Sequence, residues 1–301
     1  LVGSEMCIRD RSSWEAAEKY LQLRAARLCL QKAALPQEKV QLALAGDLQA
    51  QCTASSYAMR ELGVPFAGLF GACSTMAEGL ALGAALCEGG AARNLLAMAS
   101  SHFCAAERQF RTPLSYGAVR TPTAQWTATA AGCCLLQPQG EGVGIAAATF
   151  GRVQDYQVKD INNMGAAMAP AAASTLLHYF KDTGTEPQEF DCIYTGDLGQ
   201  VGSQLLRELL AAEGLLIKNH VDCGCILFDA NEQSVKSGGS GPGCCAAVLC
   251  GHILPRLRRG SQKRVLFTAT GALMSQTTFL QKETIPAVAH LVELRAPEKE
   301  K

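Results

Sequence analysis

The sequence predicts an α/β fold built from two related halves, each with a parallel sheet covered by helices. Short apolar runs alternate with helical segments along the 301 residues, an order that favours parallel strands joined by crossover helices. An apolar run ending in Gly-Asp occurs twice, at Asp47 and at Asp197, which indicates a weak internal duplication. Apolar residues make up 48% of the chain, which is enough to bury a large core.

Composition excludes several classes of protein. Lys+Arg and Asp+Glu both number 27, and this balance argues against a general nucleic-acid binder. No run of about 18 apolar residues predicts a membrane span, and no secretory signal opens the chain. The 14 cysteines lie mostly among small apolar residues, so we expect buried free thiols in a reducing compartment. The C-x-C spacing of Cys223 and Cys225 is not typical of a zinc site, and we expect no metal site.

The first residues, LVGSEMCIRDRS, have no helical period and no cap. They resemble a translated sequencing-adapter artefact, so we set residues 1–13 apart as non-native. The rest of the chain is divided into a first half at residues 14–153 and a second half at residues 154–301.

Capping residues and apolar runs place the elements of the first half. Ser13 can cap a helix and Gly63 can end one. Helices are predicted at residues 14–34, 55–63 and 74–86, and buried strands at 40–48, 65–73 and 92–101. Residues 101–127 mix aromatic residues, arginines and prolines, and are predicted to be mostly irregular, functional or part of an interface. Strands at 128–137 and 142–153 are expected to pair antiparallel.

The second half repeats the alternation. Helices are predicted at residues 171–184 and 202–214, with a strand at 190–199 between them. Residues 222–257 are expected to form a helix, a glycine loop and a strand. A last strand and turn are predicted at residues 263–273.

Five segments carry a family resemblance: GACSTMAEGLALGAAL, SSHFCAAERQFRTPLSYGAVRTPTAQWT, YTGDLGQVGSQ, DCGCILFD and SGGSGPGC. Together they resemble the stage V sporulation protein AD family, a degenerate branch of the thiolase and ketoacyl-synthase III-like proteins. The resemblance runs from Trp14 to the C-terminus and implies a thiolase-like fold with layered α-β-α-β-α architecture. Relatives begin with a further strand and turn, so we expect the first strand region, an inner strand of the first half, to be missing.

Cys73 stands where the enzymes of this fold place their acylated cysteine. A helix start favours the thiolate because the helix dipole lowers the thiol pKa. The resemblance implies that the catalytic partners are absent, since Gly196, Asp197 and Leu198 replace a His-Gln-Ala sequence. A second enzyme loop is expected near His220–Gly224. An acidic Asp197 beside the thiol would raise its pKa and oppose catalysis.

The resemblance implies that the ligand is dipicolinic acid (pyridine-2,6-dicarboxylate), free or as its calcium chelate, taken up into the developing spore. We expect the ligand to be bound by Cys73, Ser74, His102, Phe103, Asp197, Gly239 and Ser240. The helix start after Cys73 and the loop Gly238–Gly241 offer N–H groups to a dianion. We expect no cofactor other than calcium carried by the ligand.

Alternatives remain open. Cys73 can instead be the nucleophile of an acyl-transferring enzyme, or the protein can be a scaffold of the channel complex. His102 can equally be a structural residue at a dimer interface. Arg108 and Arg111 can clamp carboxylates, or they can pair with Glu107 and the partner subunit, because the resemblance implies that this loop builds the dimer. The resemblance implies a homodimer and SpoVA channel proteins as partners. It places the protein in the forespore, soluble or peripheral at the inner spore membrane.

Overall fold

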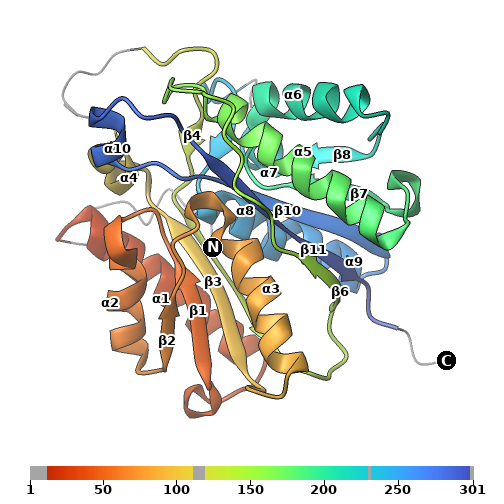
Figure 1. The fold of residues 1–301 in the computed structure, drawn as a ribbon. Coiled ribbons are helices and arrows are strands. Elements are labelled where there is room, and N and C mark those ends of the chain that lie inside the picture. Colours follow the sequence, from red (N-terminus) through yellow and green to blue (C-terminus); the bar gives the residue numbers. More distant parts are fainter. Residues whose placement is uncertain (1–11, 111–118, 230–231, 299–301) are drawn as a thin grey trace.

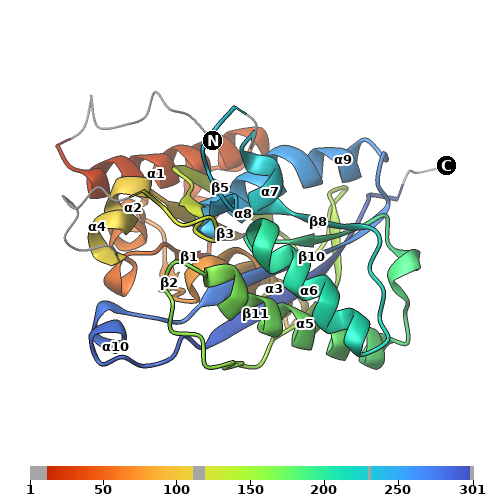
Figure 2. The same ribbon diagram turned by 90° about the horizontal axis from the view of Figure 1, so that it is seen from above.

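The fold consists of two stacked β-sheets with helices between them and on both outer faces. The computed structural model describes residues 12–110, 119–229 and 232–298 (Figure 1). Helices α1 (Trp14–Lys32) and α2 (Thr53–Leu62) cover the outer face of the first sheet. Helices α5 (Met164–Thr183) and α6 (Gly199–Ala212) cover the outer face of the second sheet, as Figure 2 shows from above.

Two buried helices fill the space between the sheets. Helix α3 (Thr75–Glu88) and helix α8 (Pro242–Val248) contact strands of both halves. Both are rich in Ala, Gly and Cys, and these small side chains allow close approach of the sheets on either side. The predicted α-β-α-β-α layering is therefore confirmed.

The two sheets share a strand order. The first sheet has the order β2-β1-β3-β5, and the second has β6-β11-β10-β7-β8, so that β8, β7, β10 and β11 repeat β2, β1, β3 and β5. The first-sheet strands are β1 (Leu42–Gly46), β2 (Phe66–Gly68), β3 (Leu95–Ser101) and β5 (Ala130–Leu136). The second-sheet strands are β6 (Gly144–Thr149), β7 (Cys192–Thr195), β8 (His220–Asp222), β10 (Arg264–Ala272) and β11 (Ala287–Arg295). The weak duplication seen in the sequence is thus present in the topology.

Strand β6 corrects the expected antiparallel pairing of residues 142–153 with residues 128–137. It pairs antiparallel with β11 and not with β5. Strand β6 therefore belongs to the second sheet, although its residues precede residue 154. Among the described residues no strand pairs with the outer edge of β5. The counterpart of β6 in the first half would therefore lie at that edge, and the inner position expected from the sequence is wrong.

Most predicted helices are confirmed together with their caps. The Ser13 side chain accepts a hydrogen bond from the Ala16 N–H at 3.1 Å, and Gly63 ends α2 in the left-handed region at φ 69°. The remaining helices are α4 (Phe103–Phe110), α7 (Cys223–Leu227), α9 (Leu254–Arg258) and α10 (Gln276–Leu280). A π-helical turn, Leu249–Ile253, joins α8 to α9, and a 3-10 turn, Ala72–Ser74, precedes α3.

One secondary-structure prediction is wrong, and several elements were not predicted. The strand expected after the glycine loop is the helical run α8–α9, because an apolar stretch buried on all sides lacks the periodicity that separates strand from helix. The stretch 101–127 contains α4 and the short strand β4 (Trp126–Thr127), while residues 111–118 lie outside the described part. Strand β11 was not predicted. No helix in the described part of the chain is long and apolar enough to cross a membrane.

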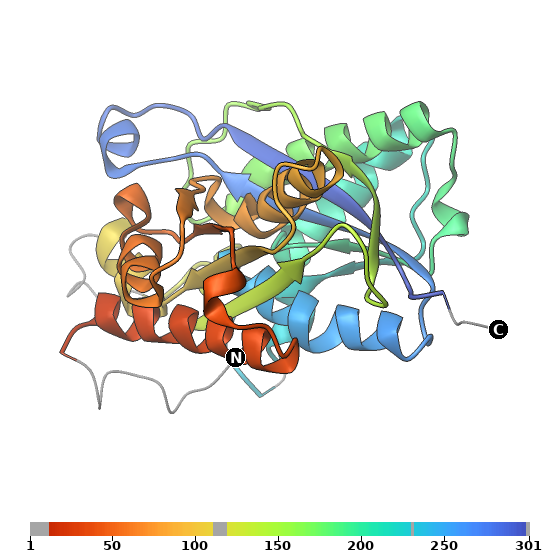
Figure 3. The same ribbon diagram turned by 90° about the horizontal axis from the view of Figure 1, so that it is seen from below.

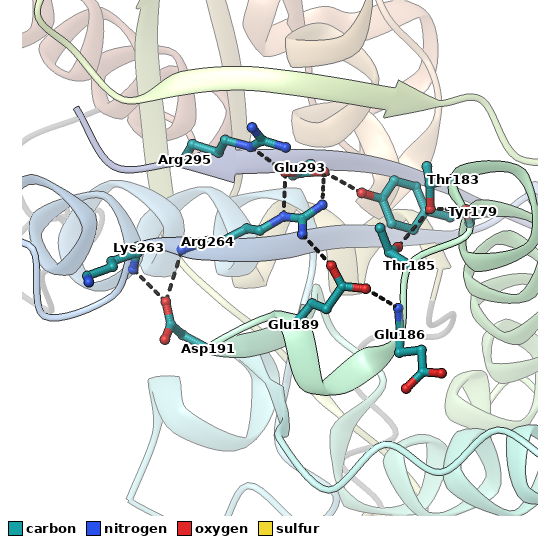
Figure 4. A network of polar contacts seen from close by, with 10 residues as sticks. All are labelled: Tyr179, Thr183, Thr185, Glu186, Glu189, Asp191, Lys263, Arg264, Glu293 and Arg295. Atoms are coloured by element: carbon teal, nitrogen blue, oxygen red, sulfur yellow. Dashed lines mark hydrogen bonds and ion pairs between the residues drawn. The ribbon is translucent and has the colours of Figure 1, made fainter. Parts of the chain in front are cut away.

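A buried ionic network ties the second sheet to α5 (Figure 4). Glu293 on β11 is 2% exposed and accepts hydrogen bonds from Arg264 Nε at 2.7 Å, from Arg295 Nε at 2.6 Å and from the Tyr179 hydroxyl. Burial alone would raise the pKa of Glu293, but the hydrogen bonds from Arg264, Tyr179 and Arg295 outweigh it and lower the pKa to about 2. The ionised carboxylate therefore stabilises the second half.

We expect Glu293→Gln to lower the free energy of unfolding at pH 7 by about 3 kcal/mol, since one partner of a buried ion pair is removed. The folded-state pKa lies below the ordinary value of 4.5. The contribution is therefore present above that value and is lost as the pH falls toward 2. Urea unfolding of both proteins at pH 7 and pH 3.5 measures it.

The matched control is Glu61→Gln, because Glu61 forms exposed ion pairs with Lys19 and Arg27. Such exposed pairs contribute little to stability because solvent screens them. An unfolding difference between parent and Glu293→Gln that stays constant from pH 7 to pH 3.5 would contradict the assignment.

Candidate functional site

Cys73 lies in a sharp turn between β2 and α3. Ala72, just before it, has a φ of 51°, in the left-handed region that non-glycine residues rarely adopt. Helix α3 begins at Thr75, so the thiol stands at a helix start as expected. Its residue is 7% exposed and lines a cavity of about 340 Å³.

The cavity is mainly apolar, with a few polar groups. Apolar lining comes from α4, from the start of α5 and from the segment after β10, which includes Leu273 and Met274. The polar and charged residues of the lining are Glu107, Arg120, Gln125, Thr127, Asn162, Ser240, Ser275 and Thr278. An apolar enclosure with a few convergent polar groups is typical of small-molecule sites.

Asp197 lies behind the cavity wall, next to Cys73. Its carboxylate accepts hydrogen bonds from Thr270 Oγ1 at 2.9 Å, Ser240 Oγ at 3.1 Å and the Gly241 N–H at 3.2 Å. The Cys73 thiol also bonds to it. Burial raises the pKa of Asp197, and these hydrogen bonds oppose the shift.

The Cys73 thiol is held in its neutral form. Burial raises the pKa of Cys73 well above its ordinary value, and the charge of Asp197 raises it further. The Gly241 N–H lowers this pKa but does not offset the two larger effects. The thiolate expected from the helix start alone is therefore not favoured.

Asp222 positions the loop that carries Asp197. Its carboxylate accepts hydrogen bonds from Thr195 Oγ1 at 2.6 Å, and from the N–H groups of Leu198 at 2.8 Å, Gly199 at 2.9 Å and Gly224 at 2.9 Å. Sequence reasoning missed Asp222, although an aspartate directly before a short helix is a typical capping residue.

The loop beside Cys73 is not the expected one. His220 lies on the edge strand β8, where Nε2 is 2.8 Å from Thr195 Oγ1 and Nδ1 is 3.4 Å from an Arg207 nitrogen. It does not line the cavity. The segment that faces Cys73 is Gly238–Gly241, whose Ser240 Oγ is 4.0 Å from the thiol sulfur.

Three other expected site residues lie outside the cavity lining. Ser74 is fully buried and its hydroxyl donates to the Gly71 carbonyl at 2.7 Å. The ring of Phe103 stacks on Trp126 with 4.4 Å between centroids. Gly239 belongs to strand β9 (Gly239–Ser240), which pairs with β4. Of the seven residues, Cys73 and Ser240 line the cavity, and Asp197 supports both.

His102 is 1% exposed and also lies outside the lining. Neither of its ring nitrogens has a hydrogen-bond partner among the described residues. Burial lowers the pKa of His102, so the ring is neutral at pH 7.

Arg120 lines the cavity next to Glu107 and was not predicted. Its Nη2 is 2.6 Å from Glu107 Oε1, and its guanidinium lies over the rings of Phe103 and Trp126. Arg108, which was expected to pair with Glu107, pairs with Glu15 instead. Arg111 lies outside the described residues.

Gln125 has one unused acceptor at the cavity. Its side-chain N–H group donates to the backbone carbonyls of Asp197 and Gly239. Its Oε1 atom is buried and has no hydrogen-bond partner in the described part of the chain. Among the described residues there is no group of three or more His, Cys, Asp or Glu side chains that could hold a metal ion.

Similar proteins agree on family and fold. The sequence model of the family described as Stage V sporulation protein AD (SpoVAD) matches residues 3–295. Stage V sporulation protein AD of Bacillus subtilis (strain 168) is 43% identical over 282 residues, which are 93% of this chain and 83% of the relative.

Two solved structures show the same fold at low identity. Cerulenin-bound OleA of Xanthomonas campestris has a TM-score of 0.62 at 16% identity, covering 95% of this chain and 81% of that one. The 3-oxoacyl-[acyl-carrier-protein] synthase III of Aquifex aeolicus VF5 has a TM-score of 0.58 at 14% identity, covering 92% and 84%. The chain thus belongs to the stage V sporulation protein AD family, sporulation proteins with a thiolase-like fold.

Proposed function

We propose that this protein binds dipicolinic acid, free or as its calcium chelate, in the cavity at Cys73, without acyl transfer. The observation that carries the proposal is the carboxylate of Asp197 beside the thiol. Covalent acyl transfer requires a thiolate and a base that manages its proton. Asp197 instead adds negative charge next to a buried sulfur, and this opposes formation of the nucleophile.

The cavity matches the shape and polarity of the ligand. Its apolar walls accommodate a flat aromatic ring, and its volume of about 340 Å³ lies in the range of small-molecule sites. Arg120 already donates from Nη1 to the Gln125 carbonyl and from Nη2 to Glu107, and its remaining N–H groups can donate to one carboxylate of the ligand. The Ser240 and Thr278 hydroxyls also line the cavity and can contact the other carboxylate.

The charge of the cavity favours the calcium chelate over the free dianion. Arg120 is already paired with Glu107, so this pair offers no net positive charge to a dianion. A one-to-one chelate of calcium and dipicolinate is neutral and avoids that cost.

The same proposal includes the place of action. Family membership supports a role in the forespore, where the protein, as a homodimer, would pass dipicolinate to SpoVA channel proteins at the inner spore membrane. The absence of a membrane-spanning helix from the described residues is compatible with a peripheral position.

Calorimetric titration of dipicolinate, with calcium and with a calcium chelator, tests the binding. We expect tighter binding with calcium, and at least a tenfold loss of affinity, about 1.4 kcal/mol, in Arg120→Gln and Ser240→Ala. His102→Ala is expected to keep the affinity, because His102 does not line the cavity.

Arg60→Gln is the matched control, since Arg60 is exposed on α2 and lies over the Tyr57 ring. Thermal unfolding of each variant separates loss of binding from loss of fold. No heat from the folded parent in either condition would overturn the proposal.

Alkylation by iodoacetamide tests the state of Cys73. Because the charge of Asp197 raises the thiol pKa, we expect Asp197→Asn to increase the alkylation rate of Cys73 at pH 8 at least tenfold. Mass spectrometry of the Cys73 peptide measures the rate, and the Cys87 peptide of the same sample is the internal control. An unchanged rate at Cys73 would remove the argument against catalysis, as would acylation of the parent at Cys73 by an acyl thioester.

A further inference from the structure

Four cysteines from three elements gather around strand β5. Cys133 and Cys134 are neighbours on β5, Cys29 lies near the end of α1, and Cys250 lies in the π-helical turn. Helix α8, the π-helical turn and α9 form one continuous helical segment, called here the α8–α9 rod. Figures 2 and 3 both place α1 and this rod end to end beside β5. None of the four thiols belongs to the cavity lining.

The four thiols form two pairs on opposite faces of the strand. Successive side chains of a strand point to opposite faces, so Cys133 meets Cys29 on the side of α1. Cys134 packs against the core shared with α8 and the turn. There its Sγ atom is 3.9 Å from Cys250 Sγ, while Cys250 also donates to the Cys133 carbonyl at 3.6 Å.

The π-helical turn Leu249–Ile253 places the Cys250 side chain against β5. Leu254 donates its N–H to the Leu249 carbonyl, the i→i+5 bond of a π-helical turn. Such turns are uncommon and often lie at functional sites. Here the turn places Cys250 beside β5, next to the contacts that α8 already makes with that strand.

The two thiols of the pair differ chemically. The hydrogen bond from Cys134 lowers the pKa of Cys250, while the pKa of Cys134 is raised. Both residues are partly exposed, unlike the fully buried Cys223, Cys244 and Cys245. A thiol with a lowered pKa next to a second thiol is the arrangement that peroxides oxidise to a disulfide.

We propose that Cys134 and Cys250 form a redox-sensitive pair that hydrogen peroxide converts to a disulfide between the two halves. The Cys250 thiolate attacks one peroxide oxygen, the O–O bond breaks, and hydroxide leaves and is protonated to water. The Cys134 thiolate then attacks the Cys250 sulfenic acid, releasing the second water and forming the S–S bond. In total two thiols and one peroxide give one disulfide and two waters, and the peroxide takes up the two electrons.

The disulfide requires the two sulfurs to approach from contact distance to about 2.05 Å. It closes a loop of roughly 117 residues, and cross-links of long loops restrict the unfolded chain most. It also fixes α8 and α9 against β5, and the first residue of α8 follows Gly241, whose N–H donates to Asp197. Oxidation should therefore be visible in thermal stability as well as in mass.

The test is treatment of the fully reduced, full-length protein with a small excess of hydrogen peroxide, followed by proteolysis and mass spectrometry without reductant. We expect a peptide pair linked through Cys134 and Cys250, lacking two hydrogen atoms and released by reductant. We also expect a higher melting temperature after oxidation.

Cys134→Ser and Cys250→Ser should each abolish the linked pair and the rise in melting temperature. Cys87→Ser is the matched control, because Cys87 is buried on α3 away from these thiols and should leave both results unchanged. A folded parent that yields no Cys134–Cys250 link would overturn the proposal. A link formed only between Cys29 and Cys133 would overturn it as well.

Discussion

The carboxylate of Asp222 is the contact on which the site depends. It accepts four hydrogen bonds, three of them from backbone N–H groups at the starts of α6 and α7. Burial raises the pKa of Asp222 to about 7, despite those bonds. The loop from Gly196 to Gly199 is thereby held in one conformation, and that conformation directs Asp197 toward Cys73.

Binding and catalysis place opposite demands on such a site. A nucleophilic thiol needs positive charge or an uncharged base close to the sulfur. A binding site needs a shaped cavity whose polar groups are fixed before the ligand arrives. Asp197 meets the requirement of a binding site. It accepts hydrogen bonds from Thr270 on β10 and from Ser240 and Gly241 in the glycine loop, and so holds these two segments together beside the thiol.

Local signals in the sequence predicted local structure well. Ser13 and Gly63 set helix ends through their own backbone, and alternating elements gave the layered fold. The pairing of β6 with β11 could not be predicted, because it joins segments far apart in the chain and either edge strand offers the same backbone groups. Helix α8 was missed because it is apolar on every side.

Site residues that lie in a recognisable sequence motif were predicted. Site residues whose role depends on contacts with residues outside such a motif were missed. Cys73 and Ser240 lie in glycine-rich turns, whereas Arg120 gains its role only through Glu107 and two stacked rings.

The duplicated Gly-Asp shows why a repeated motif does not carry one role. Asp47 accepts hydrogen bonds from the N–H groups of Gln49 and Ser55 and so organises the start of α2. In the second half Asp222 takes over that task for α6. Asp197 therefore does not cap α6, and its carboxylate is available to bond to the Cys73 thiol. A helix cap supplied from a neighbouring strand is thus what converts a structural aspartate into part of the site.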